Sequence, residues 1–318
     1  MTDSPSAAPA QLSIAALGEC MLELQGPAFG NLRQTFGGDT LNTAVYLARC
    51  GGPRLSVHYA TALGDDSLSA GLLERWAAEG VQTGLVQRLP GRLPGLYLIE
   101  LDAGGERRFH YWRDQAPARA YFDAATTALE EQAEALDALY LSGISLAILP
   151  DAGRERVLAL MARMRSRGAL VAFDNNYRPR LWASAEAARH WYERAFAAAS
   201  LALVTADDHQ ALHGLPDLDA AVAAAQALPV AEIAIKRGPL PARVGLGQTW
   251  QDVPTEAVPR VVDTTAAGDS FAAGYLARRL RGDAPAEAAA FGNRLAARVI
   301  QHPGALIPRE AMQDLMEG

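Results

Sequence analysis

Hydrophobic residues along the chain follow two alternating patterns. Short apolar runs are typical of buried strands, and longer segments with apolar residues three and four positions apart are typical of amphipathic helices. Strands are predicted at Leu12–Leu17, Ala138–Leu141, Leu170–Phe173, Leu201–Thr205 and Glu232–Lys236. Helices are predicted at 40–49, 67–79, 151–167, 184–199, 217–227, 267–280 and 284–301. Strands that alternate with helices indicate an α/β fold: a mostly parallel central sheet with helices on both faces and ligands at the carboxyl ends of its strands.

The segment 95–114 breaks this alternation. Its sequence, GLYLIELDAGGERRFHYWRD, predicts two strands around a turn at 102–105, which is a β-hairpin signal. A hairpin outside the central sheet is a candidate lid. We expect lid strands from about 19–35 and 92–114, joined in a small accessory β-sheet. We expect residues 12–318 to form one domain, which includes these lid strands.

The composition excludes several classes of protein. Residues 1–11 lack a basic start and an apolar centre, so they predict a disordered tail and not a signal peptide. The net charge of −7 argues against a broad surface for nucleic acid or anionic membrane. Cys20 and Cys50 form neither a disulfide framework nor a metal-ligand spacing, and we expect both to be buried. No apolar run approaches a membrane span. We expect a cytoplasmic protein with no nucleic-acid or membrane partner.

The stretch DTTAAGDSFAAGYLARRL at 263–280 contains the candidate chemistry. It follows the apolar pair 261–262 and predicts a strand end, a tight turn and a helix start. The backbone N–H groups of 266–268 would lie at the helix N-terminus, where they attract an anion. Asp269 would lie in the first helical turn, kept ionised by the helix dipole. An acid and an anion normally repel each other. Their proximity is explained if the acid takes the proton of a hydroxyl that attacks a phosphoryl group. The alternative is a carboxylate that only stabilises the helix.

A second polar cluster, GGDTLNTA, begins at Gly37 and leads into a predicted helix. Gly37 and Gly38 allow a ligand to approach the backbone closely. Asp39 and Asn42 offer an acceptor and a donor at the same place. The alternative is a capped helix after a glycine turn. From this segment alone the two interpretations stay open.

Two further segments place polar residues where a site could form. Asp174, Asn176 and Arg178 fit the pattern D-x-N-x-R at a predicted strand end, where this architecture builds its ligand sites. In FHYWR at 109–113, on the candidate lid, alternate residues share a face, so an aromatic residue and an arginine lie together. For the segment with D-x-N-x-R, the alternative is a solvated loop. For FHYWR, the alternative is an ordinary amphipathic strand with Arg113 in solvent.

The string DTTAAGD at 263–269 resembles the DTxGAGD signature of the ribokinase-like (PfkB) family of carbohydrate kinases. Ala266 stands where that family usually has glycine, and we expect it to be tolerated if its φ is negative. The strings GECMLEL, FGGDTLNTA, LPGLY, FHYWR, YLSGISLAIL, FDNNYRPRLWAS and DTTAAGDSFAAGYL extend the resemblance from about Ile14 to Arg309. They are most similar to the branch that acts on 2-keto-3-deoxygluconate. The resemblance implies a ribokinase-like fold and ATP-dependent phosphorylation of that sugar acid at its 6-hydroxyl.

The resemblance also implies roles for individual residues. In the catalytic group, Asp269 would be the base, and the anion hole would consist of Ala266, Ala267 and Gly268. Substrate would be bound by Gly38, Asp39, Asn42, Tyr97, Tyr111, Arg113 and Arg178. ATP would be bound by Asn176, Lys236, Arg237, Gly238, Gly268 and Asn293. Mg²⁺ would bridge the phosphates, held largely by water and substrate. No protein ligand is assigned to the metal, because the place of the family's N-x-x-E motif reads DDHQ at 207–210. A homo-oligomer is expected.

Two alternatives stay open. The substrate could be a related acid or sugar: 2-keto-3-deoxygalactonate, 5-keto-2-deoxygluconate or fructose. The chain could also be a sugar-acid sensor without catalytic activity, because a fold does not fix a function. A sensor has no need of a carboxylate beside an anion hole, so Asp269 favours catalysis.

Overall fold

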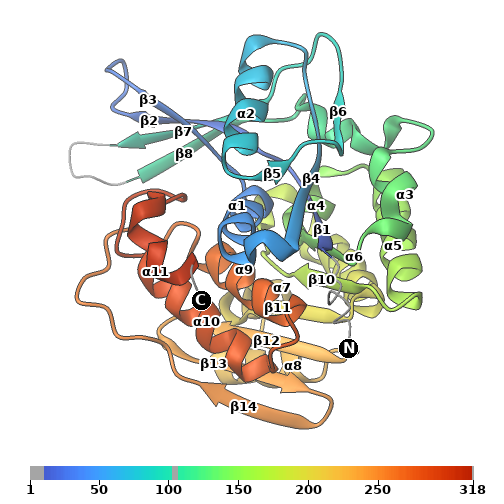
Figure 1. Ribbon diagram of the computed structural model, residues 1–318, viewed down its shortest axis with the longest axis vertical. Helices are drawn as coiled ribbons and strands as arrows, with labels where there is room; N and C mark the ends of the chain where they lie inside the picture. The colour runs from blue at the N-terminus through green and yellow to red at the C-terminus, as the bar shows by residue number, and fades with distance from the viewer. Residues whose placement is uncertain (1–10, 102–106, 317–318) are drawn as a thin grey trace, which may run out of the picture.

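A ten-stranded sheet forms the centre of the molecule, and a smaller four-stranded sheet projects from one side (Figure 1). The structure is a computed structural model that describes residues 11–101 and 107–316. The order of the central sheet is β14-β13-β12-β11-β10-β9-β1-β4-β5, with β6 paired to β4. Its strands are β1 (Leu12–Leu17), β4 (Leu55–Leu63), β5 (Val81–Gln82), β6 (Val86–Arg88), β9 (Ala138–Ser142), β10 (Leu170–Asp174), β11 (Leu201–Thr205), β12 (Glu232–Arg237), β13 (Leu240–Leu246) and β14 (Thr249–Val253). The strands from β5 to β12 in this order pair in parallel, and the hairpin β13–β14 is antiparallel.

Helices cover both faces of this sheet, as predicted. One face packs against α3 (Ala128–Gln132), α4 (Gly143–Ile148), α5 (Asp151–Ser166), α6 (Ala185–Ala198), α7 (Ala206–His213) and α8 (Leu218–Gln226). The other packs against α1 (Asp39–Gly51), α2 (Ser67–Ala78), α9 (Ala267–Leu280), α10 (Pro285–Val299) and α11 (Gln313–Met316). Short 3₁₀ helices lie at Gly52–Arg54, Pro117–Asp123, Ala133–Ala135, Pro179–Leu181 and Arg309–Met312.

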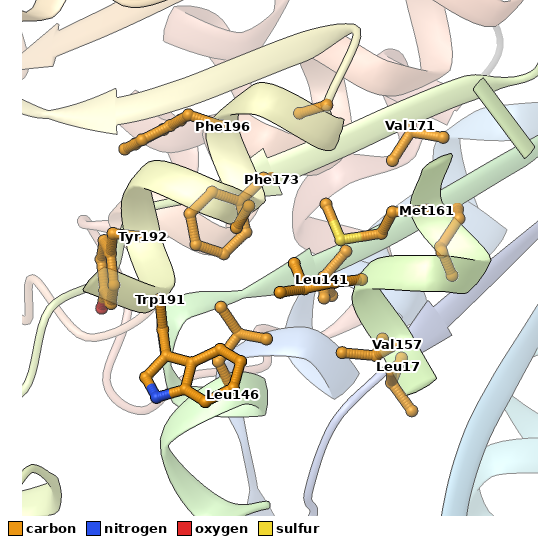
Figure 2. Packing of buried hydrophobic residues seen from close by; sticks show 14 of the residues in the cluster. Leu17, Leu141, Leu146, Val157, Met161, Val171, Phe173, Trp191, Tyr192 and Phe196 are labelled. Atoms are coloured by element: carbon orange, nitrogen blue, oxygen red, sulfur yellow. The ribbon is translucent and has the colours of Figure 1, made fainter. Parts of the chain in front are cut away.

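The alternation of side chains along each strand builds two hydrophobic cores. In β9, Leu139 and Leu141 belong to one core, and Ala138 and Tyr140 belong to the other. Figure 2 shows the first core, in which strand residues such as Leu141 lie among side chains from α4, α5 and α6. Because both faces are covered, central strands such as β1, β9, β10 and β11 are largely apolar, which makes them recognisable in the sequence.

The smaller sheet confirms the predicted accessory sheet. Its strands are β2 (Met21–Gly26), β3 (Arg33–Gly37), β7 (Gly95–Leu101) and β8 (Arg107–Trp112), in the order β3-β2-β7-β8. The hairpin β7–β8 pairs through β7 with β2, which comes from the segment expected as its partner. The predicted turn at 102–105 and the tail at 1–10 lie outside the described residues.

The predicted strand end at 261–262 is wrong. Both valines lie in an irregular segment and are exposed, and the Val262 N–H donates to the carbonyl of Ile300 at 2.8 Å. The sheet has no place for a strand here, because its edge beyond β12 is occupied by the hairpin β13–β14. That hairpin and the helices α4 and α7 were not predicted.

Cys20 and Cys50 are buried and free, as expected. None of the helices in the described part of the chain is long and apolar enough to cross a membrane.

Candidate active site

The candidate residues converge on the carboxyl edge of the central sheet. Ser142, Asp174 and Lys236 lie at or near the ends of β9, β10 and β12. The helices α1 and α9 begin at Asp39 and Ala267 and pack against each other. Strand β1 lies between β4 and β9, so the chain order reverses here, which is where open α/β sheets bind ligands.

Asp269 lies in the first turn of α9 and is held by α1. Asn42 Nδ2 donates to Asp269 Oδ2 at 2.8 Å, and Thr43 Oγ1 donates to the Asp269 carbonyl at 3.2 Å. The pKa of Asp269 is raised to about 7, first by desolvation and then by the charge of Asp39, although the bond from Asn42 opposes the shift. The helix dipole was expected to keep this carboxylate ionised; desolvation and the charge of Asp39 act against the dipole and move the pKa toward neutrality.

The loop before α9 has a fixed shape. Asp263 accepts hydrogen bonds from the N–H and Oγ1 of Thr265 at 3.0 and 2.7 Å and from the Gly304 N–H at 3.0 Å. Ala266, at the N-cap, has φ 60° and ψ 15°, which is left-handed. The condition of a negative φ is therefore not met, and the alanine occupies a conformation that favours glycine.

A cavity of about 740 Å³ lies beside the start of α9. This volume is within the range of small-molecule sites. Its wall includes most of the residues expected to bind ATP, namely Lys236, Arg237, Gly238, Gly268 and Asn293, together with Ala267. Apolar side chains complete it, among them Leu240, Val258, Val261, Phe271 and Ile300. Val261, one of the apolar pair at 261–262, therefore contributes to the cavity wall and not to the sheet. Asn293 Nδ2 donates to the carbonyls of Val253 and Pro254, at 3.2 and 2.9 Å, and so fixes the start of the segment along this cavity.

Asp39 is the centre of a hydrogen-bond network on the other side of Asp269. Its Oδ2 accepts from Ser142 Oγ at 2.5 Å and from Asn176 Nδ2 at 2.6 Å. The structure thus places Asn176 beside Asp39 and not among the described residues that line the cavity, although we expected it on the ATP side. Asn176 also has a positive φ of 23°. A Cβ at Gly38 would lie 2.1 Å from the Glu19 carbonyl, so close backbone packing requires a glycine there.

The lid residues form contacts with two buried glutamates. The Tyr97 hydroxyl donates to Glu23, and the rings of Tyr97 and Tyr111 lie 5.9 Å apart. Arg113 forms an ion pair with Glu19, and their side chains are 10% and 1% exposed. The alternative that Arg113 lies in solvent is therefore wrong. Burial raises the pKa of Glu19, and Arg113 opposes that shift.

Arg178 and the neighbouring acids form the outer part of the site. Arg178 Nη1 donates to both carboxylate oxygens of Asp208 at 3.2 Å, and half of its side chain is exposed. Asp207 lines the cavity. Within 11–101 and 107–316, no group of three or more histidine, cysteine, aspartate or glutamate side chains is placed to hold a metal ion.

Sequence reasoning missed Ser142, Glu19 and Glu23, which support the candidates, and it named Asp174 without its pairing to Lys236. Ser142 holds Asp39, Glu19 and Glu23 hold lid residues, and Asp174 holds Lys236. Ser142 could have been identified from the sequence YLSG, in which a serine and a glycine directly follow an apolar strand. Glu19 and Glu23 could have been identified as two acids in the apolar string GECMLEL, because acids in such a string can be buried only with partners.

The chain belongs to the pfkB family of carbohydrate kinases. The family's sequence model, pfkB family carbohydrate kinase, matches residues 11–312. The ribokinase-like fold and the family resemblance are thereby confirmed.

Relatives of known name cover almost the whole chain. It is 48% identical over 304 residues to the 2-dehydro-3-deoxygluconokinase of Escherichia coli strain K12, which covers 94% of this chain and 98% of that protein. It is also 48% identical, over 305 residues, to the 2-dehydro-3-deoxygluconokinase of Dickeya dadantii, with the same coverage of 94% and 98%. Among solved structures, the PfkB protein of Polaromonas sp. JS666 superposes with a TM-score of 0.80 at 26% identity, over 96% of this chain and 100% of that one.

Proposed function

We propose that this protein transfers the γ-phosphoryl group of ATP to the 6-hydroxyl of 2-keto-3-deoxygluconate, the sugar acid that the relatives' names call 2-dehydro-3-deoxygluconate. The observation that carries the proposal is the position of Asp269. It follows Ala267 and Gly268, which line the nucleotide-sized cavity, and it is held by Asn42 next to Asp39 on the other side. A carboxylate between two such subsites is placed to act on a hydroxyl that attacks a phosphate.

Asp269 would accept the proton of that hydroxyl. The sugar oxygen forms a bond to the γ-phosphorus, and the bond from that phosphorus to the β,γ-bridging oxygen breaks, so that ADP leaves. A general base is most effective when its pKa lies near the working pH. The pKa of about 7 suits this role better than that of an ordinary aspartate would. Because phosphoryl transfer has a loose transition state, a weak base is sufficient.

The cavity would bind ATP, and the charge of its phosphates requires compensation. Lys236, Arg237 and the start of α9 supply positive charge in its wall. Mg²⁺ fits the donor set here as an ion bound by phosphates and water, with Asp207 and Glu256 as acidic residues in the wall. When bound, it would neutralise charge on the phosphates.

The sugar acid would lie between Asp39 and the lid. Gly38, Asp39 and Asn42 would contact its hydroxyls, and Tyr97 and Tyr111 would cover it. Half of the Arg178 side chain is exposed and its guanidinium pairs with Asp208, so a substrate carboxylate would share this guanidinium with Asp208. Arg113 already pairs with Glu19, so a substrate carboxylate would share its guanidinium with that residue. A guanidinium can grip a carboxylate through two parallel hydrogen bonds.

The test is ATP consumption against a panel of sugar acids and neutral sugars. We expect kcat/KM for 2-keto-3-deoxygluconate to exceed that for 2-keto-3-deoxygalactonate, 5-keto-2-deoxygluconate and fructose. Neutral sugars should be poor substrates, because they cannot form the charge-assisted hydrogen bonds that a carboxylate forms with a guanidinium. Equal kcat/KM for fructose would overturn the substrate, and binding of the acid without turnover would favour a sensor.

The proposal also includes a homo-oligomer in the cytoplasm. Support for an oligomer comes from β8, a strand at the edge of the lid sheet, where Phe109, Tyr111 and Trp112 are 43%, 48% and 59% exposed. An apolar sheet edge favours association with another chain. Light scattering of the purified protein tests the oligomeric state.

A further inference from the structure

Lys236 is the only lysine among the 29 basic residues of this chain. It lies near the end of β12, where the pairing with β13 shifts register between Ile235 and Arg237. An irregularity of this kind re-aims a side chain and is common next to active sites. The side chain lies in the cavity wall, and only 11% of it is exposed.

Asp174 holds the ammonium group of this lysine. Lys236 Nζ lies 2.6 Å from Oδ2 of Asp174, the last residue of β10. Because β11 separates β10 from β12, the lysine stem spans two strand spacings, about 9–10 Å. The Asp174 side chain is 4% exposed; burial raises its pKa, and Lys236 opposes that shift. A carboxylate so deeply buried keeps its charge only beside a cation.

The same ammonium lies against the start of α9. A Cβ added at Gly268 would be 3.5 Å from Lys236 Nζ, so the cation is close to the helix N-terminus. The positive end of the helix dipole repels a cation and attracts an anion. An anion between them would be attracted by both, and the cavity gives it access. A phosphoryl oxygen has the required charge.

We propose that Lys236 is the cation that contacts the phosphoryl group during transfer, and that Asp174 is a positioning residue that holds its ammonium against α9. This inference rests on the proposed ATP-dependent reaction. An ammonium has three donors on a compact centre, so one bond to Asp174 leaves two for phosphoryl oxygens. A guanidinium is planar and wider, and its donors form a rigid fork. This accounts for a lysine at 236 in a chain whose other basic residues are arginines.

A chain with a single lysine allows a direct chemical test. An amine-acetylating reagent modifies Lys236 and the terminal amino group, and peptide mass mapping separates the two sites. Saturating ATP with Mg²⁺ should slow acetylation at Lys236 about tenfold or more and leave the terminus unchanged. In Asp174→Asn the ammonium loses the carboxylate that holds it, so the amine is freer to meet the reagent and acetylation should be faster. Acetylation at Lys236 that ATP does not slow would overturn the proposal.

A double-variant cycle separates this role from a purely structural ion pair. Breaking a buried pair on one side leaves an unpaired charge, whereas removing both partners is often neutral for stability. If the pair only holds the fold, Asp174→Asn combined with Lys236→Met should regain activity. We expect kcat to be about 10²–10³-fold lower in Lys236→Met and in the double variant. Asp174→Asn should lower kcat about 10–100-fold, with the sugar-acid KM unchanged. A double variant with wild-type kcat would overturn the proposal.

The strand itself offers a matched control. Glu232, at the other end of β12, forms an ion pair with Arg279 at 2.7 Å, and its side chain is 6% exposed. Arg279→Met should lower stability and leave kcat within about threefold, because this pair lies outside the cavity wall. If the wild type turns over no sugar acid, the proposed reaction fails, and ATP protection still tests the contact at Lys236. If the wild type is active and Lys236→Met is equally active, this inference alone fails.

Discussion

Replacement of Asp269 by asparagine separates two consequences of its position. The shape is kept, and the amide oxygen can still accept the 2.8 Å hydrogen bond from Asn42. The proton acceptor is lost, so kcat should fall by about 10²–10⁴-fold. ATP binding should change little, because the nearby part of the cavity wall is the backbone of Ala267 and Gly268. Turnover by a coupled assay and ATP affinity by calorimetry measure the two effects.

Asp269→Asn should lower kcat but raise the free energy of unfolding. Because the pKa of Asp269 rises from 3.8 to about 7, the folded protein between these values binds a proton that the unfolded chain has released. Stability therefore falls as the pH rises through this window. One pKa unit corresponds to about 1.4 kcal/mol, so the cost above pH 7 is at most about 4 kcal/mol. We expect about 1–3 kcal/mol, because the side chain keeps some contact with solvent.

Asp269→Asn removes this cost, so its gain in stability should be near zero at about pH 4 and largest at about pH 8. Urea unfolding at these two values gives the free energies of unfolding. The matched control is Asp219→Asn, in which an exposed aspartate in the first turn of α8 is changed. A gain that is equal at both pH values would refute the reasoning about the pKa, and turnover near the wild-type rate would refute the role as a base.

Three further predictions concern the loop before α9, the lid and the arginines. Ala266→Gly should raise the free energy of unfolding by about 1 kcal/mol, because glycine adopts a left-handed φ without strain, and should change kcat by no more than a few-fold; a loss of stability by calorimetry would contradict this. The described parts of 95–112 should exchange amide hydrogens faster than the central sheet without substrate and more slowly with it; equal exchange in both states would count against a lid. Arg178→Ala should raise KM for the sugar acid about ten- to a hundred-fold and spare ATP, because a charge-assisted hydrogen bond contributes about 1.5–3 kcal/mol. Arg113→Ala should raise the same KM and also lower stability, since Glu19 loses its partner. An unchanged KM in both variants would show that neither arginine binds the substrate carboxylate.

The parallel core of the fold was predictable because both of its faces are covered. β1 and β11 have the bounds that their apolar runs predict, and α9 has the bounds predicted from its start signal and spacing. The hairpin β13–β14 was not predicted, because its strands are partly exposed and the first is interrupted by Pro241 and Gly245. Val261 shows the opposite error, since an apolar residue can line a cavity outside any strand.

Motif reasoning identified candidate residues but not their environment. Asp269 was readable from its string, whereas its raised pKa depends on Asp39, which is far away in the sequence. The family resemblance assigned Asn176 to the phosphates of ATP, yet the side chain of this residue donates a hydrogen bond to Asp39. Its role, like those of the other site residues, stays a prediction until variants are measured. Such pairings are long-range, and a single sequence does not contain them.

The buried ion pair between Glu19 and Arg113 constrains any attempt to redesign the substrate range of this enzyme. Glu19 lies in the short link from β1 to β2, and Arg113 directly follows β8, so the pair joins two of the links between the lid and the central sheet. If Arg113 binds the substrate carboxylate as proposed, its exchange for a neutral residue is a first step toward a neutral sugar, and that exchange leaves Glu19 buried without its partner at a cost of about 3–5 kcal/mol. The two positions therefore have to be changed together. A library that varies Arg113 alone would lose its best variants to misfolding before their specificity could be measured.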